Sequence, residues 1–178
     1  MMTNTACLRT DFMTAKKHLS HGFWNVRTLR ENSRLDELVE QALKFKLNFL
    51  ATREVRQLSF GTEILKGHKF LFSGQDDHHR EEVGQLLNTK ASKALLEWKP
   101  VNSRILTAGF ASRHAKMTLV SVYAPTNDAD SNKDEFYSIL KYVIRAAPRY
   151  DIMCVLGDFD AKVGDDTEYA SCVIGRHG

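Results

Sequence analysis

Two kinds of apolar pattern alternate along the chain. Apolar side chains recur every three or four positions between residues 33 and 46 and again between 131 and 147, the spacing of one helix face. The first stripe consists of Leu35, Leu38, Val39, Ala42 and Leu43, and the second of Phe136, Leu140, Val143 and Ala147. The pattern therefore predicts a helix in each segment.

Short apolar runs of the kind found in buried strands lie around these helices. They cover residues 21–26, 47–51, 69–72, 83–87, 105–110, 117–123 and 152–156. Because a helical crossover returns the chain in its original direction, the order strand, helix, strand over residues 21–51 predicts a parallel pair. The predicted fold class is therefore α/β.

The length of 178 residues and a hydrophobic content of 43% suit one domain with its own core. Residues 1–20 lack apolar periodicity, so we expect a loosely ordered leader there. No internal repeat or low-complexity linker divides the rest, which predicts a single domain over residues 21–178.

Composition narrows the function only slightly. The net charge of +3 is compatible with a polyanionic partner and equally with an ordinary soluble domain. The cysteines, Cys7, Cys154 and Cys172, are far apart and form no CxxC motif, so neither a disulfide framework nor a cysteine zinc cluster is predicted. With no apolar stretch suited to a membrane span or signal peptide, we expect an intracellular protein of the nucleus or cytoplasm.

Acidic side chains follow two of the predicted strands. Asp158 and Asp160 come directly after the run 152–156, where open α/β sheets place ligand-binding groups, and they suggest cation binding or proton transfer. A solvated acidic turn is the alternative. Glu54 follows the run 47–51 between Arg53 and Arg56, and an exposed ion pair explains it equally well.

Three further polar residues stand at or near strand ends. Asn25 is the last residue but one of the first run, and Tyr123 and Asn127 lie where the run 117–123 enters a proline turn. Each has an ordinary structural explanation, since Asn commonly bonds backbone at a strand end and proline favours turns.

Taken in order, four segments resemble the endonuclease/exonuclease/phosphatase superfamily. They are residues 24–29, 54–56, 123–128 and 157–164, the last reading Gly-Asp-Phe-Asp-Ala-Lys-Val-Gly. Similarity at residues 94–102 and 175–178 points more narrowly to the endonuclease domain of non-LTR retrotransposons and to craniofacial development protein 2-like proteins.

The resemblance implies a four-layer α/β sandwich, two facing mixed sheets flanked by helices, that hydrolyses phosphodiester bonds with Mg²⁺, or with Mn²⁺ in its place. DNA is the implied substrate. Carried over residue by residue, Glu54 matches the metal-binding glutamate and Asn25 the asparagine beside metal and phosphate. Tyr123 and Asn127 match the phosphate-contacting segment, and Asp158 matches the aspartate that positions or deprotonates the attacking water.

The sequence also departs from that family. Asp160 stands where the family has an asparagine whose amide donates to the phosphate, and an ionised carboxylate cannot donate. The family has a glycine at the position of Glu82 and an apolar residue at that of Gln85. The family's C-terminal Ser-Asp-His segment has no counterpart before Gly178.

These departures lead to two hypotheses. We expect an incomplete second sheet and an endonuclease domain of retroelement origin with reduced or no activity. The alternative is a non-catalytic remnant that binds phosphate, nucleic acid or protein.

Overall fold

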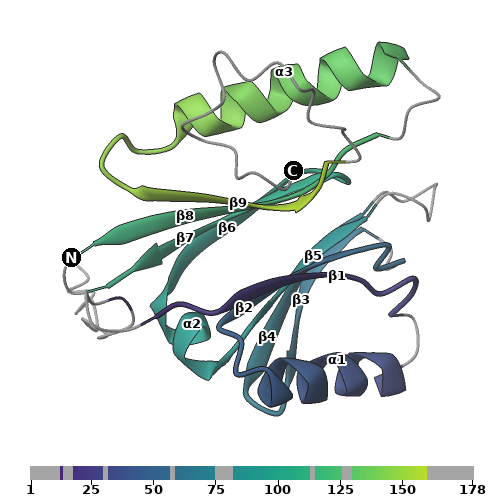
Figure 1. Ribbon diagram of the computed structural model, residues 1–178, viewed down its shortest axis with the longest axis vertical. Helices are drawn as coiled ribbons and strands as arrows, with labels where there is room; N and C mark the ends of the chain where they lie inside the picture. The colour runs from purple at the N-terminus through teal and green to yellow at the C-terminus, as the bar shows by residue number, and fades with distance from the viewer. Residues whose placement is uncertain are drawn as a thin grey trace, which may run out of the picture.

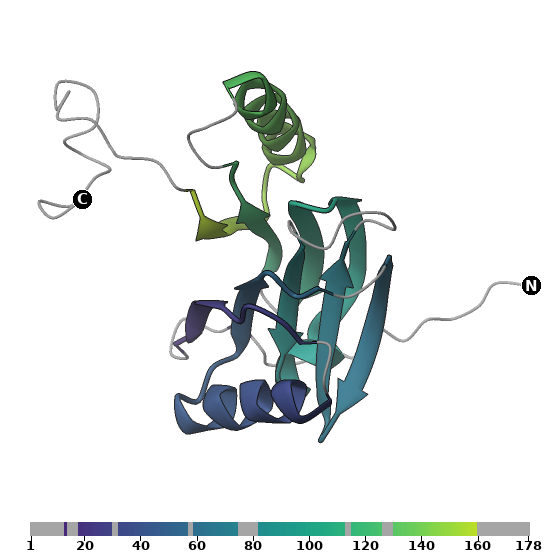
Figure 2. The same ribbon diagram turned by 90° about the vertical axis from the view of Figure 1, so that its right-hand side faces the viewer.

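Two β-sheets pack face to face, and each carries one long helix on its outer face (Figure 1). This arrangement comes from a computed structural model, which describes residues 13, 18–29, 32–56, 59–74, 82–112, 115–125 and 130–159. The second view shows the same order of layers from α1 at the bottom to α3 at the top (Figure 2).

The N-terminal sheet has the strand order β1-β2-β5-β4-β3. Its strands are β1 (His21–Asn25), β2 (Phe49–Arg53), β3 (Phe60–Leu65), β4 (His68–Ser73) and β5 (Val83–Leu87). Strands β1 and β2 are parallel and are joined by helix α1 (Asn32–Lys44), as predicted, whereas the other neighbours are antiparallel.

The C-terminal sheet has the order β6-β7-β8-β9. Its strands are β6 (Leu95–Asn102), β7 (Ile105–Ala111), β8 (Lys116–Tyr123) and β9 (Ile152–Asp158). A short helix, α2 (Thr89–Ala94), leads into it from the N-terminal sheet. Strands β8 and β9 are parallel and are joined by helix α3 (Asp130–Ala146), so each sheet contains one parallel pair with a helical crossover.

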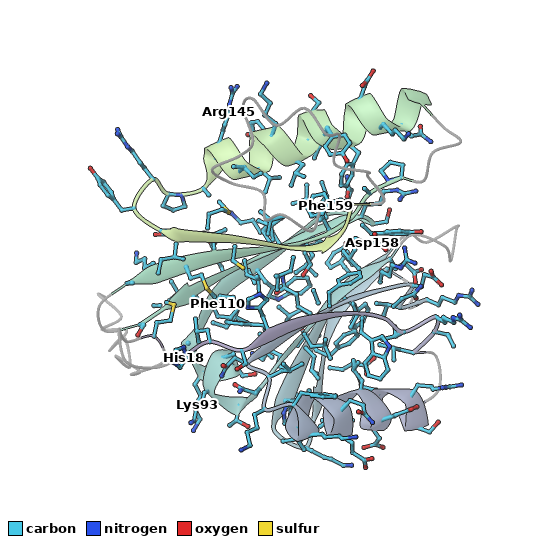
Figure 3. All side chains as sticks on the ribbon, viewed as in Figure 1. His18, Lys93, Phe110, Arg145, Asp158 and Phe159 are labelled. Atoms are coloured by element: carbon cyan, nitrogen blue, oxygen red, sulfur yellow. The ribbon has the colours of Figure 1, made fainter. Side chains whose placement is uncertain are left out.

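Period-2 alternation sends the side chains of each sheet to two different cores. The inner core lies between the sheets, where Phe49 of β2 meets Phe110 of β7 edge to face with ring centroids 5.0 Å apart. Figure 3 labels Phe110. Two outer cores fix the helices, with α1 packing on Phe70 and α3 packing on Val120. The predicted α/β sandwich of helix, sheet, sheet and helix is therefore confirmed.

The apolar pattern located most elements and missed three. The prediction that Leu43 belongs to the buried stripe of α1 is wrong, because this residue lies at the margin of the stripe and is 55% exposed. The three missed elements are β3, β6 and α2. Strands β3 and β6 were missed because they are sheet edges with exposed apolar positions, and β6 also contains Pro100, which is tolerated on an edge strand. Helix α2 is too short to show a helical period.

Met13, inside the predicted leader, is buried in the inner core, and its backbone N–H donates to Ser112 Oγ at 2.9 Å. The division of the chain at residue 20 remains a prediction. Within the described residues, neither α3 nor any shorter helix is long and apolar enough to cross a bilayer.

Candidate functional site

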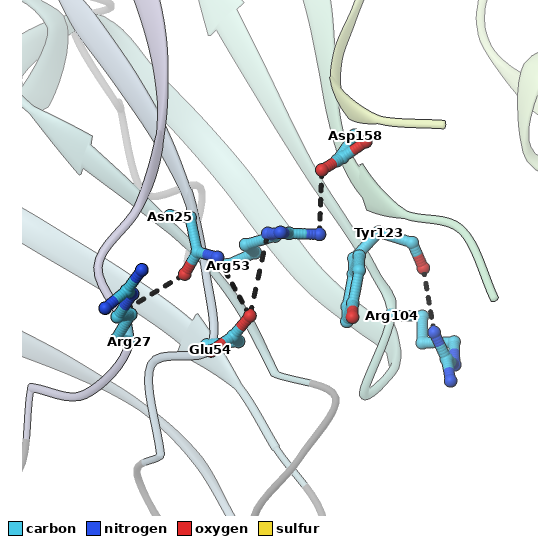
Figure 4. A network of polar contacts seen from close by, with 7 residues as sticks. All are labelled: Asn25, Arg27, Arg53, Glu54, Arg104, Tyr123 and Asp158. Atoms are coloured by element: carbon cyan, nitrogen blue, oxygen red, sulfur yellow. Dashed lines mark hydrogen bonds and ion pairs between the residues drawn. The ribbon is translucent and has the colours of Figure 1, made fainter. Parts of the chain in front are cut away.

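The two parallel strand pairs bring their carboxyl ends to the same end of the sandwich. Asn25 and Arg53 are the last residues of β1 and β2 and are register partners, and Tyr123 and Asp158 stand in the same relation on β8 and β9. Figure 4 shows these ends facing each other across the two sheets. This is the position at which parallel strands present ligand-binding groups.

Glu54 follows β2 directly and has a left-handed backbone with φ 59°. This conformation costs a non-glycine residue roughly 1–2 kcal/mol, and such strain concentrates at functional sites. Its carboxylate Oε1 accepts a 2.9 Å hydrogen bond from Asn25 Nδ2. Asn25 Oδ1 accepts from the backbone N–H of Arg27 at 3.1 Å, so both ends of the amide are held.

Arg53 connects the two sheets through its guanidinium group. One terminal nitrogen lies 2.7 Å from Asp158 Oδ2, and Nε lies 3.7 Å from Glu54 Oε1 (Figure 4). The three side chains are only 19%, 29% and 23% exposed, in the order Arg53, Asp158 and Glu54. The exposed ion pair considered for Glu54 is thus a partly buried network that spans the sheets.

Tyr123 lies between two guanidinium groups. The centroid of its ring is 4.9 Å from Cζ of Arg53 and 5.1 Å from Cζ of Arg104, distances that allow cation–π attraction. Arg104 also donates to the carbonyl oxygen of Tyr123 at 3.3 Å. Sequence reasoning missed Arg104, because the turn that carries it follows β6, an edge strand that the apolar pattern did not reveal.

Of the six predicted site residues, the structure brings Asn25, Glu54, Tyr123 and Asp158 together. Asn127 and Asp160 lie outside the described residues, and their roles remain predictions. Burial raises the pKa of the Cys154 thiol, on β9 four residues before Asp158, and this disfavours the reactive thiolate.

Glu82 and Gln85, which differ from the residues expected from the family resemblance, are both buried. Glu82 is 1% exposed and Gln85 is 0% exposed. Within the described part of the chain, neither polar atom of the Gln85 side chain has a hydrogen-bond partner.

The donors at the site suit a hard cation such as Mg²⁺, although the described residues contain no group of three or more His, Cys, Asp and Glu side chains that could hold a metal. Mg²⁺ is usually held by one or two carboxylates, with water and substrate oxygens completing its coordination. Glu54 supplies one carboxylate, and Asn25 supplies an amide next to it. These residues therefore fit a metal site in which the protein supplies few ligands.

Solved structures similar to this chain define the class of its fold. The endonuclease/exonuclease/phosphatase family protein from Leptotrichia buccalis aligns with a TM-score of 0.58 and 12% identity over 81% of this chain and 67% of that protein. The endonuclease domain of TRAS1, a telomere-specific non-LTR retrotransposon, aligns with a TM-score of 0.58 and 18% identity, over 79% of this chain and 59% of that domain. D. rerio TDP2, complexed with a single-strand DNA product, aligns with a TM-score of 0.56 and 19% identity, over 86% of this chain and 64% of that protein. The chain has the fold of the endonuclease/exonuclease/phosphatase superfamily.

In sequence the chain is similar to craniofacial development protein 2 from two species. That protein from Bos taurus is 26% identical over 164 residues, and that from Tragulus javanicus is 25% identical over the same length. These alignments cover 92% of this chain but only 27% and 28% of the relatives, so the chain spans about a quarter of their length. No family model matches the chain. The resemblance expected from the motifs is confirmed.

Proposed function

We propose that this chain is a divalent-metal-dependent phosphodiesterase domain that cuts DNA. One observation carries the proposal: Asn25, Glu54, Tyr123 and Asp158 meet where the two parallel strand pairs end. A DNA substrate is supported by the names of the similar structures, which include a retrotransposon endonuclease domain and a protein bound to single-strand DNA.

Each side chain of the site has a role in this proposal. Asp158 holds or deprotonates the attacking water, which requires a carboxylate within hydrogen-bonding reach of the nucleophile. Tyr123 and Asn127 contact the phosphate. Glu54, with Asn25 beside it, would hold Mg²⁺ or Mn²⁺, and the bound ion would supply polarisation of the phosphoryl oxygen and offset charge on the leaving oxygen. Partial burial strengthens these electrostatic effects relative to bulk water.

The test is the nicking of supercoiled plasmid, followed on agarose gels with Mg²⁺ and with excess EDTA. Glu54→Gln keeps the size of the side chain and removes its charge, and we expect the nicking rate to fall by about 100-fold or more. Glu97→Gln is the matched control, because Glu97 is an exposed carboxylate, 69% accessible and paired with Lys99. Equal nicking by E54Q and the unaltered protein would remove Glu54 from the site.

Reduced activity is part of the proposal. Asp160 puts a carboxylate where the resembled family has an amide donor, and a missing donor of this kind costs on the order of 3 kcal/mol of transition-state stabilisation. Asp160→Asn should therefore raise the Mg²⁺-dependent nicking rate, measured on the same plasmid. An unchanged or lower rate would show that Asp160 is not the defect.

A second candidate function is DNA binding without cleavage. It is favoured by Arg104, whose guanidinium lies 5.1 Å from the centroid of the Tyr123 ring and adds positive charge at the site. In this case a fluorescein-labelled oligonucleotide would bind with salt-dependent affinity that E54Q leaves unchanged, while no nicking is seen at any Mg²⁺ concentration. An intracellular location, in the nucleus or cytoplasm, fits either function.

A further inference from the structure

Arg53 contacts Glu54, Asp158 and the ring of Tyr123. It ends β2 four residues after Phe49 of the inner core, so period-2 alternation puts its side chain on the face that points between the sheets. Its backbone is fixed as well, because its carbonyl oxygen accepts from the N–H of Val26 at 3.2 Å.

The guanidinium group places a permanent positive charge where the two candidate carboxylates converge. Arginine is not deprotonated in proteins, so this charge does not depend on pH in the working range. The network is partly buried, and ion pairs in such surroundings are screened less than pairs at the surface. Arg53 therefore offsets repulsion between Glu54 and Asp158 in the absence of any bound cation.

A divalent cation at Glu54 would act on the same carboxylate. Oε1 of Glu54 already accepts from Asn25 at 2.9 Å and faces Nε of Arg53 at 3.7 Å. Two cations near one carboxylate repel each other, so part of the attraction that Glu54 offers a metal is cancelled by Arg53.

We propose that Arg53 is a positioning residue that acts as a resident cation: it joins Glu54 to Asp158 across the two sheets and competes with the divalent cation at Glu54. The proposal rests on the proposed function, in which Glu54 is the metal ligand. In this role Arg53 sets the affinity of the site for the divalent cation and does not itself bind phosphate or transfer a proton.

The test is a titration of the full chain with Mn²⁺ alone, with free Mn²⁺ measured by electron paramagnetic resonance. Arg53→Gln removes the charge, and we expect it to tighten Mn²⁺ binding by about tenfold. Arg53→Lys keeps the charge and should bind Mn²⁺ within about threefold of the unaltered protein, a rescue that a purely structural role does not predict. Arg145→Gln is the charge-matched control on exposed α3, distant from Asp158 in Figure 3, and should change the affinity by less than about twofold.

Glu54→Gln separates this inference from the proposed function. Loss of Mn²⁺ binding in E54Q, combined with unchanged or weaker binding in R53Q, overturns the role of Arg53 and leaves the proposed ligand in place. Mn²⁺ binding that E54Q does not alter overturns the ligand, and with it the competition. If circular dichroism shows that R53Q is unfolded, Arg53→Met replaces it, and we expect the same tightening of Mn²⁺ binding. If neither variant folds at any Mn²⁺ concentration, Arg53 is required for folding and the proposal is overturned.

Discussion

At the scale of single residues, the site depends on side chains whose positions are fixed from more than one direction. Asn25 is held by Glu54 and by the backbone of Arg27, and Tyr123 is held between two guanidinium groups. Such preorganisation is what a catalytic or binding site requires, because groups that are already placed need no reordering when the ligand arrives.

Tyr123 allows the packing of its ring to be separated from the chemistry of its hydroxyl group. Tyr123→Ala removes the ring from both arginines and from the inner core, so we expect the free energy of unfolding to fall by about 1–3 kcal/mol. Tyr123→Phe keeps the ring and should stay within about 0.5 kcal/mol of the unaltered protein.

Urea denaturation measures both variants, and plasmid nicking then reports on the hydroxyl group. A slower Tyr123→Phe variant of full stability would support the phosphate contact. If Tyr123→Ala were as stable as the unaltered protein, the ring would not be held as the structure shows.

At the scale of elements, the close approach of β9 to β8 fixes the position of Asp158. A Cβ atom at Gly157 would overlap the backbone carbonyl oxygen of Val122, so no side chain fits there without moving one strand. Strand β9 delivers Asp158 to the site, and the packing at Gly157 therefore sets the location of the proposed catalytic carboxylate.

Gly157→Ala should lower the free energy of unfolding by about 2 kcal/mol or more and also reduce nicking, because β9 must shift. Gly109→Ala on β7 is the control, since its added Cβ would meet Glu97 Cγ at an ordinary 3.6 Å. We expect this control to change stability by no more than about 0.5 kcal/mol in thermal denaturation. Equal stability of the two variants would contradict the described β8–β9 contact.

At the scale of the whole molecule, each sheet repeats one plan, a parallel strand pair joined by a helix that covers its outer face. The sequence predicted this plan where strands were apolar and helices had a clear stripe. Strand ends alone left ordinary structural explanations open for Asn25, Glu54, Tyr123 and Asp158, and it was the family resemblance of the segments around them that marked them as a candidate site.

The sequence could not predict the contact between Arg53 and Asp158. These residues are on different sheets, and only the packing of one sheet on the other decides which strand ends face each other. Arg104 was missed for a different reason: it lies in the turn after the unrecognised edge strand β6, and its place beside Tyr123 depends on the pairing of β7 with β8 within one sheet. Strand periodicity contains no information on such contacts.

The inner core contains an amide that offers a further test. Gln85 is fully buried, and its side-chain oxygen and nitrogen have no hydrogen-bond partner among the described residues. Because burial of such a group costs about 1–3 kcal/mol, Gln85→Met should raise the free energy of unfolding by about 1–2 kcal/mol. A loss of stability in urea denaturation would show that the amide is satisfied by water or by another part of the chain.

The central claim is that residues from both sheets form one metal-dependent site, and a double-mutant cycle tests it most directly. Plasmid nicking rates are measured with Mg²⁺ for the unaltered chain, Glu54→Gln, Asp158→Asn and the double variant. Residues that act as one unit give non-additive losses of rate. The nicking rate of the double variant should therefore lie within about threefold of the rate of the slower single variant. Losses that multiply, or nicking by the unaltered chain that persists undiminished in EDTA, would contradict the claim.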